Sequence, residues 1–526
     1  MSGGSLRNGK TTRREILKTA AAGSALAAMQ AFPFAPAIAQ GARRDLRVGV
    51  FGGDFGNLSP VIRLDIQGGL VVYNIFDQLV QIDFASRQII PWLAESWAHP
   101  DPLTWRIKLR NGVKWHRGYG EFQASDVVHT WLYHLESKSF QIGTALFPID
   151  IVKADGKYVV EVKTKQPFGA FPGVTMGYGG LMISEKAHNE IGNQAYSYKP
   201  IGHGAYMVEA VRGNEIELVR NPDYWRQGYP KLERIHYRAI PDSSVRLQAL
   251  MRGEVDFITH PDPREVGEAR RNSKYTTVST PGWNWDYQQF NLKSDANLPF
   301  KNKLLRQAIS YVIDREAIVN EIYDGEATIT DNQIPSGYLG HRKSPLRYPK
   351  NSDLKKAREL MAQAGVQGYE VEVITSDKDW LRKELELVAA MVSQIGINYK
   401  IRGLDIGGFN NLWLNKRFDQ HLEDISLVAP DPDATSWWFL HSEGASSGFS
   451  NSEMDALLDR ARSETDPKTR EPLYHRIVEM TLEECPTIYH CNVNYIQVFD
   501  KRLIGFRPTP QEYFQPHDST AWSGAS

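Results

Sequence analysis

The sequence contains little of several features that define whole classes of protein. Two cysteines among 526 residues are too few for a disulfide-stabilised scaffold. The 61 lysine and arginine residues against 62 aspartate and glutamate residues give a formal net charge of -1, so the basic excess typical of nucleic-acid binding is missing. Hydrophobic residues make up 41 % of the chain, which excludes a disordered protein, and at this length we expect more than one domain.

Signals for catalysis or metal binding are also sparse. The sequence has no His-Glu-x-x-His zinc motif. Cys485, His490 and Cys491 lie close together but do not have the spacing of a zinc site, so we expect buried free thiols or one local disulfide. The sequence therefore predicts no catalytic residues, no metal site and no cofactor.

The N-terminal 39 residues differ in charge from the rest of the chain. They carry five basic residues and one acidic residue, a net charge of +4, which leaves -5 for residues 40–526. The basic stretch is followed by the apolar run 19–32 and by Ala-Ile-Ala at 37–39, which is the three-part form of a secretory signal. The Arg-Arg pair at 13–14 resembles a twin-arginine signal, which implies export after folding. Because the run is shorter than the roughly 20 residues of a membrane span, we expect a cleaved signal rather than an anchor.

Strand and helix patterns alternate in the second half of the mature chain, which favours an α/β domain. Helices are expected at 304–323, 353–364, 380–395, 452–463 and 467–484, and strands at 369–375 and 399–404. In the first half, alternation on both sides of Asn111-Gly112 predicts a hairpin over 105–118, and a polar turn at 212–214 predicts another over 202–225.

Aromatic residues gather at two places. Alternation predicts that Trp283, Trp285 and Tyr287 share one face of an extended segment, and Trp437 follows the acidic turn Asp-Pro-Asp at 431–433. Flat rings of this kind can form the wall of a solute pocket, and they can equally pack in ordinary cores. The pocket interpretation suits a sugar or a cationic ligand, because a cation over a ring gains roughly 0.5–2 kcal/mol.

An ordered series of short stretches resembles one known family throughout the mature chain. Examples are Pro-Trp-Leu-Ala-Glu-Ser-Trp at 91–97 and Arg-Asn-Pro-Asp-Tyr-Trp at 220–225. The full series comprises 72–74, 77–80, 91–97, 109–116, 124–128, 200–206, 220–225, 253–256, 306–309, 313–318, 357–365, 455–458 and 464–467. On these residues the chain resembles the extracytoplasmic solute-binding proteins of ABC importers in the peptide/opine/nickel class, family 5.

The resemblance implies a periplasmic-binding-protein-like α/β fold with two lobes and an extra inserted domain. The domains expected on this basis are the signal peptide at 1–39, the first lobe at 40–80, 199–288 and 499–526, the inserted peripheral domain at 81–198 and the second lobe at 289–498. The lobes would be connected by extended crossings near 287–291 and 492–499. His116 and Asp126 are expected to hold local structure and not to act as catalytic groups.

Two departures from the family pattern concern the ligand. Peptide-binding members similar to this chain carry an aspartate three residues before the Asp-Pro turn, where this sequence has Val428, and a tryptophan where it has Ile406. The usual anchor for a peptide ammonium group is then missing, and Asp431 and Asp286 are candidates to replace it. From the aromatic clusters and the resemblance together we expect a ligand site that includes Tyr73, Asn74, Trp283, Trp285, Tyr287, Asp431 and Trp437.

The function expected from the resemblance is that of a periplasmic receptor. A monomer would capture a peptide or peptide-like solute between its lobes and deliver it to ABC permease subunits in the cytoplasmic membrane, with no nucleic-acid partner. An opine, an amino-acid conjugate or an oligosaccharide stays open as the ligand. The alternatives from other classes are an exported hydrolase or metalloenzyme, and a solute sensor or chaperone-like protein on the same scaffold.

Overall fold

The computed structural model describes residues 44–53, 55, 57–61, 66–84, 86, 88–137, 148–293, 299–342, 345–426, 431–444, 447–512, 514 and 516–524. Residues Arg44–Ser526 form one compact unit, and the description below concerns that unit. The predicted signal at 1–39 lies outside the described residues. Among the described helices, none combines the length and the apolar character needed to cross a bilayer.

The first lobe is built on a mixed sheet. Its β1 (Asp45–Val50) pairs in parallel with β10 (Arg234–Ala239) and β11 (Phe257–Thr259), and β9 (Glu215–Arg220) and β8 (Tyr206–Arg212) extend the sheet in antiparallel fashion. Helices α2 (Ile66–Ile75), α6 (Ser243–Met251) and α7 (Gly267–Arg271) belong to this lobe. Alternate residues of β10 are buried, as a half-covered sheet requires, whereas the last three residues of the central strand β1 are all buried.

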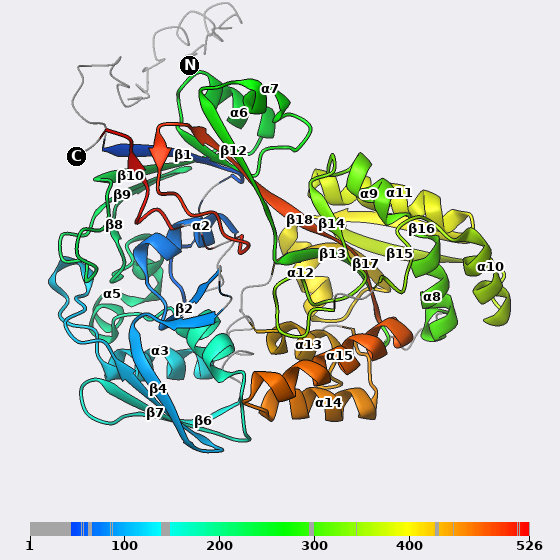
Figure 1. Cartoon of the computed structure of the whole chain (residues 1–526), viewed down its shortest axis with the longest axis horizontal. Helices are drawn as coiled ribbons and strands as arrows, with labels where there is room; N and C mark the ends of the chain where they lie inside the picture. The colour runs from blue at the N-terminus through cyan, green and yellow to red at the C-terminus, as the bar shows by residue number, and fades with distance from the viewer. Residues whose placement is uncertain are drawn as a thin grey trace, which may run out of the picture. The chain divides into compact units, whose positions relative to one another are not determined.

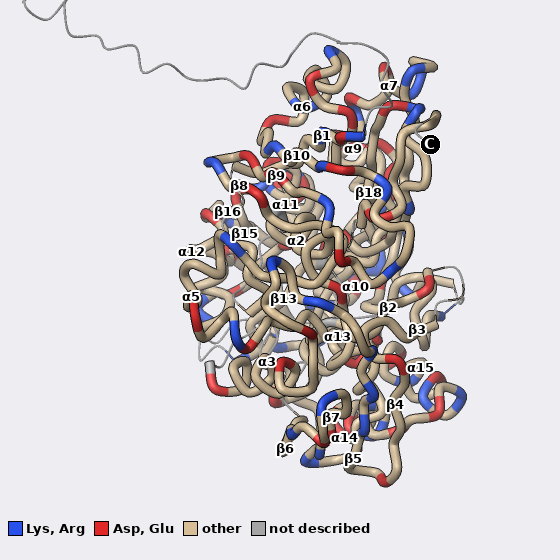
Figure 2. The backbone as a smooth tube through the Cα atoms, turned by 90° about the vertical axis from the view of Figure 1, so that its left-hand side faces the viewer, with Lys and Arg blue, Asp and Glu red and all other residues tan. Residues whose placement is uncertain are grey.

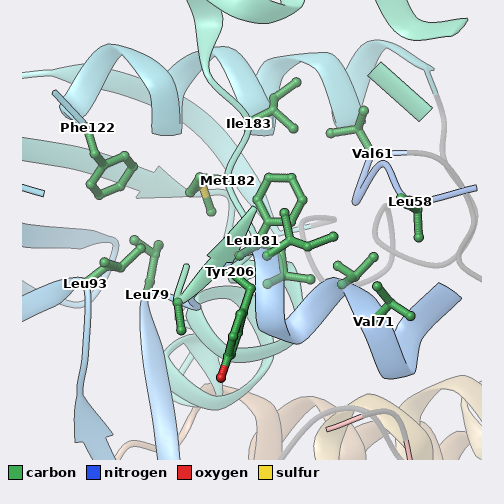
Figure 3. Close-up of a cluster of buried hydrophobic side chains, with 14 of the residues drawn as sticks. Leu58, Val61, Val71, Leu79, Leu93, Phe122, Leu181, Met182, Ile183 and Tyr206 are labelled. Atoms are coloured by element: carbon green, nitrogen blue, oxygen red, sulfur yellow. The ribbon is translucent and has the colours of Figure 1, made fainter. Parts of the chain in front are cut away.

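A second, antiparallel sheet is inserted in the first lobe. It has the order β4 (Ala94–Asp101), β5 (Thr104–Leu109), β7 (Val159–Thr164), β6 (Ile149–Ala154). The hairpin of β2 (Val80–Asp83) and β3 (Gln88–Pro91) precedes this sheet, and α3 (Ala124–Ser137), the short helix η2 (Pro172–Gly177), η3 (Tyr178–Gly180) and α5 (Glu185–Tyr198) complete the region. Its core is continuous with that of the first lobe. Figure 3 shows Leu79, Leu93, Phe122, Met182 and Tyr206 among the side chains gathered in that shared core.

The second lobe is an α/β unit. Parallel strands β15 (Tyr369–Ser376) and β16 (Ile397–Leu404) lie beside β17 (Gln420–Ser426) and β13 (Asn284–Phe290). The helices of this lobe are α8 (Lys303–Val312), α9 (Arg315–Glu321), α10 (Leu354–Gln363), α11 (Asp379–Ser393), α12 (Ile406–Leu414), α13 (Asp433–Leu440), α14 (Ser452–Ser463) and α15 (Pro467–Glu484). A second large hydrophobic cluster, made of residues between Trp283 and Cys491, forms the core of this lobe.

One long strand is shared by both lobes. The first half of β18 (Thr487–Asp500) pairs with β13 and β14 (Ala327–Ile329), and the second half pairs with β11 and β12 (Tyr275–Pro281). The described strands of the two lobes thereby join in one sheet of twelve strands. In Figure 1, β18 and the β12–β13 segment run side by side from the strands around β1 to those around β15. The two-lobed α/β fold class expected from the sequence is confirmed, whereas the exact domain boundaries stay a prediction.

Local predictions had mixed outcomes. The hairpin at 202–225 is confirmed as β8 and β9. The hairpin over 105–118 is wrong: β5 pairs with β4 and β7, and after the turn at Gly112 the side chains of Val113 and Trp115 enter the first core. The helix expected over 304–323 is two helices, because Asp314 accepts a hydrogen bond from the Ala317 N–H and starts α9.

Charged residues of both signs are distributed over the whole fold. Figure 2 shows lysine and arginine interspersed with aspartate and glutamate along the chain. This pattern agrees with the nearly balanced composition, and over the described residues it shows no basic stripe of the kind that binds a nucleic-acid backbone.

Candidate functional site between the lobes

The chain crosses between the lobes at Gly282 and at Val493. The Asn284 side chain fixes this crossing, because its Oδ1 accepts a hydrogen bond from the Val493 N–H at 2.7 Å and its Nδ2 donates to the Val493 carbonyl at 3.1 Å. A Cβ atom at Gly282 would lie 2.3 Å from the Val493 carbonyl oxygen. The two strands therefore meet at a tight, glycine-dependent point, where a small change in backbone angles would change the angle between the lobes.

A series of aromatic rings runs beside this crossing from one lobe to the other. Tyr73 of α2 lies 5.3 Å from Phe514, which lies 6.1 Å from Phe84 in the β2–β3 hairpin. Phe84 lies 5.5 Å from Trp283, and Trp283 lies 4.5 Å from Tyr338, all as distances between ring centroids. The hairpin of the first lobe thus packs on the core of the second lobe through Phe84.

Asp431 lies at the same junction but its charge is already paired. Arg470 of α15 donates to both carboxylate oxygens of Asp431 at 2.8 Å, and both side chains are buried. A Cβ atom at Gly173 of the first lobe would lie 3.0 Å from the Asp431 Cβ, so the two lobes are in close contact here. A carboxylate held in this bidentate manner has little remaining capacity for a ligand ammonium group.

Trp437 belongs to a neighbouring pair of the same type. Arg462 makes a buried bidentate contact with Asp433, with distances of 2.9–3.2 Å, and its guanidinium lies 4.2 Å from the Trp437 ring centroid. On its helix, Trp437 stacks on His441 at 4.7 Å. The two buried pairs, Asp433 with Arg462 and Asp431 with Arg470, therefore hold the start of α13 against α14 and α15.

Two of the expected aromatic residues are fully inside the second lobe. Trp285 and Tyr287 are 0 % and 1 % exposed, and both rings contact Phe439 of α13, at 5.9 and 5.3 Å. Sharing Phe439 confirms that they lie on one face of β13. Trp283 precedes the strand and contacts Phe84 and Tyr338 instead, so the structure does not bring the three rings into one wall.

Asn74 lies in the first core, one residue after Tyr73. Its side chain bonds the Tyr237 hydroxyl at 3.1 Å and accepts from the His517 N–H at 2.9 Å, which ties α2 to β10 and to the C-terminal segment. Burial raises the pKa of the Tyr73 phenol, which therefore stays neutral. The assignment of these two residues to a ligand site stays a prediction.

The other candidate for an ammonium anchor, Asp286, is buried in a polar network of the second lobe. The Tyr323 hydroxyl contacts the Asp286 carboxyl and also lies 3.0 Å from Glu384 Oε2, while Glu384 Oε1 lies 2.5 Å from His490 Nδ1. Burial and the neighbouring carboxylate of Glu384 raise the pKa of Asp286 well above its usual range. A fully buried carboxyl with a raised pKa and a phenol as its partner is a poor anchor for an ammonium group.

The two positions that depart from the family pattern are Val428 and Ile406. Val428 lies outside the described residues. Ile406 is the first residue of α12 and is 52 % exposed. The proposal that these positions lack the usual anchor stays a prediction.

The two cysteines and two short motif matches in the sequence do not form a catalytic site in the part of the chain that the structure describes. Cys485 and Cys491 are buried free thiols. The sequence matches Gly-x-x-x-x-Gly-Lys-Thr at 4–11, which lies outside the described residues, and Gly-x-Ser-x-Gly at 444–448. A nucleophile elbow needs a strand before the serine, whereas the segment at 444–448 follows α13 and precedes α14.

Several of the family-like motifs are distant in the sequence but come together in the fold around one buried carboxylate, that of Asp77. It accepts hydrogen bonds from the indoles of Trp92 and Trp225, both at 2.8 Å, and from the Tyr224 hydroxyl at 3.3 Å. The stretches 77–80, 91–97 and 220–225 therefore hold the first lobe together. Asp126 has a comparable structural role, since it accepts from the Trp115 indole and from the Gln123 and Glu185 N–H groups.

Residues that the sequence did not single out complete the junction. They are Phe84, Tyr338, Phe514, Arg462 and Arg470. The two arginines are separated from their aspartates by 29 and 39 residues in the sequence. Only the fold brings them together.

Comparison with known proteins gives one family profile and a set of full-length relatives. The profile described as "Bacterial extracellular solute-binding proteins, family 5 Middle" matches residues 88–447. The glutathione-binding protein GsiB of Pectobacterium atrosepticum is 25% identical over 491 residues, which cover 89% of this chain and 92% of that protein. Heme-binding protein A of Haemophilus influenzae is 25% identical over 474 residues, which cover 84% of this chain and 85% of that protein.

Solved structures show the same fold. The periplasmic binding protein DppA of Helicobacter pylori, in complex with the peptide STSA, superposes with a TM-score of 0.81 at 22% identity, covering 92% of this chain and 98% of that one. The AgaA protein of A. tumefaciens R10, in complex with agropinic acid, gives a TM-score of 0.80 at 23% identity, with 91% and 99% covered. At these identities the likeness concerns the fold alone.

Proposed function

Because the chain belongs to the bacterial extracellular solute-binding proteins of family 5, we propose that it captures a peptide or peptide-like solute between its two lobes and hands it to an ABC permease. The observation that carries this proposal is the family match over 88–447 on a fold whose lobes meet at one strand crossing. In this proposal the protein works as a monomer in the periplasm, after export through its twin-arginine-type signal, and it carries out no catalysis.

Capture follows from differential binding. A solute that contacts both lobes stabilises the closed form more than the open form, and that difference alone shifts the population. A change of about 10⁴-fold in the ratio of closed to open form takes about 5.5 kcal/mol of differential binding. The rings of Tyr73, Phe84 and Trp283 come from both sides of the junction and would supply apolar contact, with net hydrogen bonds of about 0.5–1.5 kcal/mol each adding to it.

The chemistry of the junction favours a solute that does not depend on a carboxylate anchor. Asp431 is paired with Arg470, and Asp286 is bonded to Tyr323. Glutathione, whose amino group sits on a γ-linked glutamyl residue, is the first probe, because a glutathione-binding protein is among the relatives. An opine such as agropinic acid is the second probe, since a structural neighbour was solved with it.

The test is binding of defined solutes to the purified protein. Reduced glutathione, the dipeptide Met-Leu, agropinic acid and maltotriose would be titrated by calorimetry and by thermal unfolding. A solute at 100 times its Kd should raise the free energy of unfolding by about 2.7 kcal/mol. Trp283→Ala should weaken the solute that binds, and Trp380→Ala, which removes a tryptophan that is 40 % exposed on α11, is the matched control.

The outcomes separate the alternatives. Binding of glutathione or Met-Leu supports the peptide-like class, and binding of agropinic acid or maltotriose instead would replace it. If no probe binds and mass spectrometry finds no solute carried through purification, the capture proposal is wrong.

A further inference from the structure

A short segment of the first lobe docks on the end of a helix in the second lobe. The Gly169 N–H donates to the Arg462 carbonyl oxygen at 2.7 Å, and the Phe168 ring centroid lies 5.6 Å from the Arg462 guanidinium. A few residues on, Gly173 is in contact with Asp431. The segment 168–173 therefore contacts the junction at the side of the paired aspartates.

This contact supplies a hydrogen-bond donor to a carbonyl group at the C-terminal end of α14. The last four carbonyl groups of a helix lack partners within the helix. In α14 the Arg460 carbonyl accepts from the Glu464 N–H, the Ala461 carbonyl accepts from Arg470 Nε at 3.0 Å, and the Arg462 carbonyl accepts from Gly169. The third of these partners comes from the other lobe, so one of the end carbonyls of α14 gains its partner when the two lobes are in contact.

A side chain at position 169 is incompatible with this contact. A Cβ atom there would lie 1.8 Å from the Glu464 carbonyl oxygen, 2.5 Å from its carbonyl carbon and 2.9 Å from the Thr465 nitrogen. All three are main-chain atoms, so no change of rotamer relieves the overlap. Gly169 is not among the residues with positive φ, so alanine fits its own backbone conformation and the cost falls on the contact between the lobes.

The receiving surface is held in place by the charge pairs described above. Arg462 is fixed by Asp433 and by the Trp437 ring, and Arg470 is fixed by Asp431. Since four buried charged groups in two bidentate pairs resist rearrangement, the turn at 462–465 has little freedom to move away from an added methyl group.

We propose that Gly169 is a positioning residue for lobe closure, which caps α14 across the junction and admits the closed state because it has no side chain. The inference rests on the proposed capture function, which it deepens by naming the contact that limits closure. Replacing Gly169 would shift the equilibrium toward the open form without removing any contact to the solute, and a bound solute would then leave faster.

The experiment compares Gly169→Ala with Gly403→Ala in the purified full chain. Gly403 lies in β16, and a Cβ atom there would meet nothing within 4 Å, so this variant controls for the added methyl group. Small-angle scattering should give a larger radius of gyration for Gly169→Ala and no change for Gly403→Ala. Gly173→Ala, whose Cβ would press on the Asp431 Cβ at 3.0 Å, should fall between them.

Hydrogen exchange on the unmodified chain gives a test that does not depend on a variant folding. The Gly169 amide should exchange several-fold more slowly than an unprotected loop amide, because its N–H is bonded across the junction. Exchange at the unprotected rate would show that the contact is not populated and would overturn the inference. Equal radii for all three variants, with native circular dichroism, would overturn it as well.

The solute probes distinguish this inference from the proposed function. With reduced glutathione as the probe, Gly169→Ala should release it about tenfold faster at a similar association rate. If glutathione and the other probes fail to bind the unmodified chain while Gly169→Ala still opens it, the capture proposal falls and the closure contact stands. If a probe binds both chains equally and their scattering is identical, the closure contact falls alone.

Discussion

Asp77 in the first lobe and the pair Asp431 and Asp433 in the second lobe are all buried, but their partners are of different kinds. In the first lobe, Asp77 is held by neutral donors, namely two indoles and a phenol. In the second lobe, Asp431 and Asp433 are held by the guanidinium groups of Arg470 and Arg462. The first arrangement leaves the carboxyl free to take up a proton, whereas an arginine partner keeps its charge at every pH of interest.

The difference separates one buried aspartate that responds to pH from two whose arginine partners stay charged. Burial raises the pKa of Asp77 to about 6, against the lowering effect of the hydrogen bonds from Trp92 and Trp225. Arg470, by contrast, has its pKa raised well above its usual value despite burial, through the charge of Asp431. The surface of the second lobe that receives Gly169 is therefore held by charges that persist across the physiological range.

Removing one member of an arginine pair is the strongest way to break the comparison. Asp433→Ala would leave the buried Arg462 without its counter-charge, and we expect a loss of about 3–5 kcal/mol in the free energy of unfolding. Urea denaturation measures it, with Glu453→Ala as the control, because Glu453 pairs with Arg476 on the exposed side of α14. A loss below about 1 kcal/mol, as for an exposed pair, would mean that water reaches Arg462.

Asp77→Asn tests whether Asp77 contributes a pH-dependent part of the stability. The pKa of Asp77 is higher in the folded than in the unfolded state, so the folded protein binds more protons between about pH 4 and pH 6. The contribution of Asp77 to stability is therefore present at low pH and is lost as the pH rises through this window. We expect the advantage of the unmodified chain over Asp77→Asn to shrink by about 2–3 kcal/mol between pH 4 and pH 7.

The measurement is urea unfolding of both proteins across that pH range. Buried histidines such as His116, whose pKa burial lowers to about 4, contribute in the opposite direction but equally in both proteins. Their effect cancels in the difference. A difference that is constant from pH 4 to pH 7 would contradict the assignment.

Trp92→Phe sharpens the comparison by removing one donor and keeping a ring. The Asp77 carboxylate would lose an N–H partner at 2.8 Å, which we expect to cost about 1.5–3 kcal/mol at pH 7 and less at pH 4, where the carboxyl is protonated. The ring contact with Trp225, at 5.3 Å, would largely remain. The pH dependence of the loss distinguishes a lost donor from lost packing, since packing alone would give the same loss at both pH values.

An exposed charge pair should give the smallest effect. Lys114 and Asp223 lie 2.7 Å apart with side chains that are 59% and 56% exposed. Lys114→Ala should change the free energy of unfolding by about 0.5 kcal/mol or less in urea denaturation, and less still in high salt. A larger loss would show that an exposed ion pair contributes to stability as much as the buried pairs, against the comparison above.

The sequence predicted the fold class but not the connections inside it. Period-two and period-3.6 patterns depend on neighbouring residues, so β8, β9, β15 and most helices of the second lobe could be located. The hairpin expected at Asn111-Gly112 failed because the partners of β5 come from elsewhere in the chain. A turn signal indicates that the chain bends and does not say which strand lies beside it.

The candidate site was predictable in its residue types more than in its geometry. Alternation correctly placed Trp285 and Tyr287 on one face, but whether that face meets solvent or a core depends on α13, which is distant in sequence. Asp431 looked like a free carboxylate because nothing near it in the sequence reveals Arg470. The backbone bond from Gly169 to Arg462 involves no distinctive side chain, so no sequence pattern could have indicated it.

The position of β18 also constrains how the chain can be assembled. This strand comes late in the sequence and yet lies between β13 and β11, in the middle of the joined sheet. Residues beyond it, such as Leu503 and Trp522, fill the first core, and the Trp522 indole donates to the Asp45 carbonyl at the start of β1. Until these residues emerge from the ribosome, both lobes have an unpaired sheet edge, so neither can finish folding during most of its own synthesis.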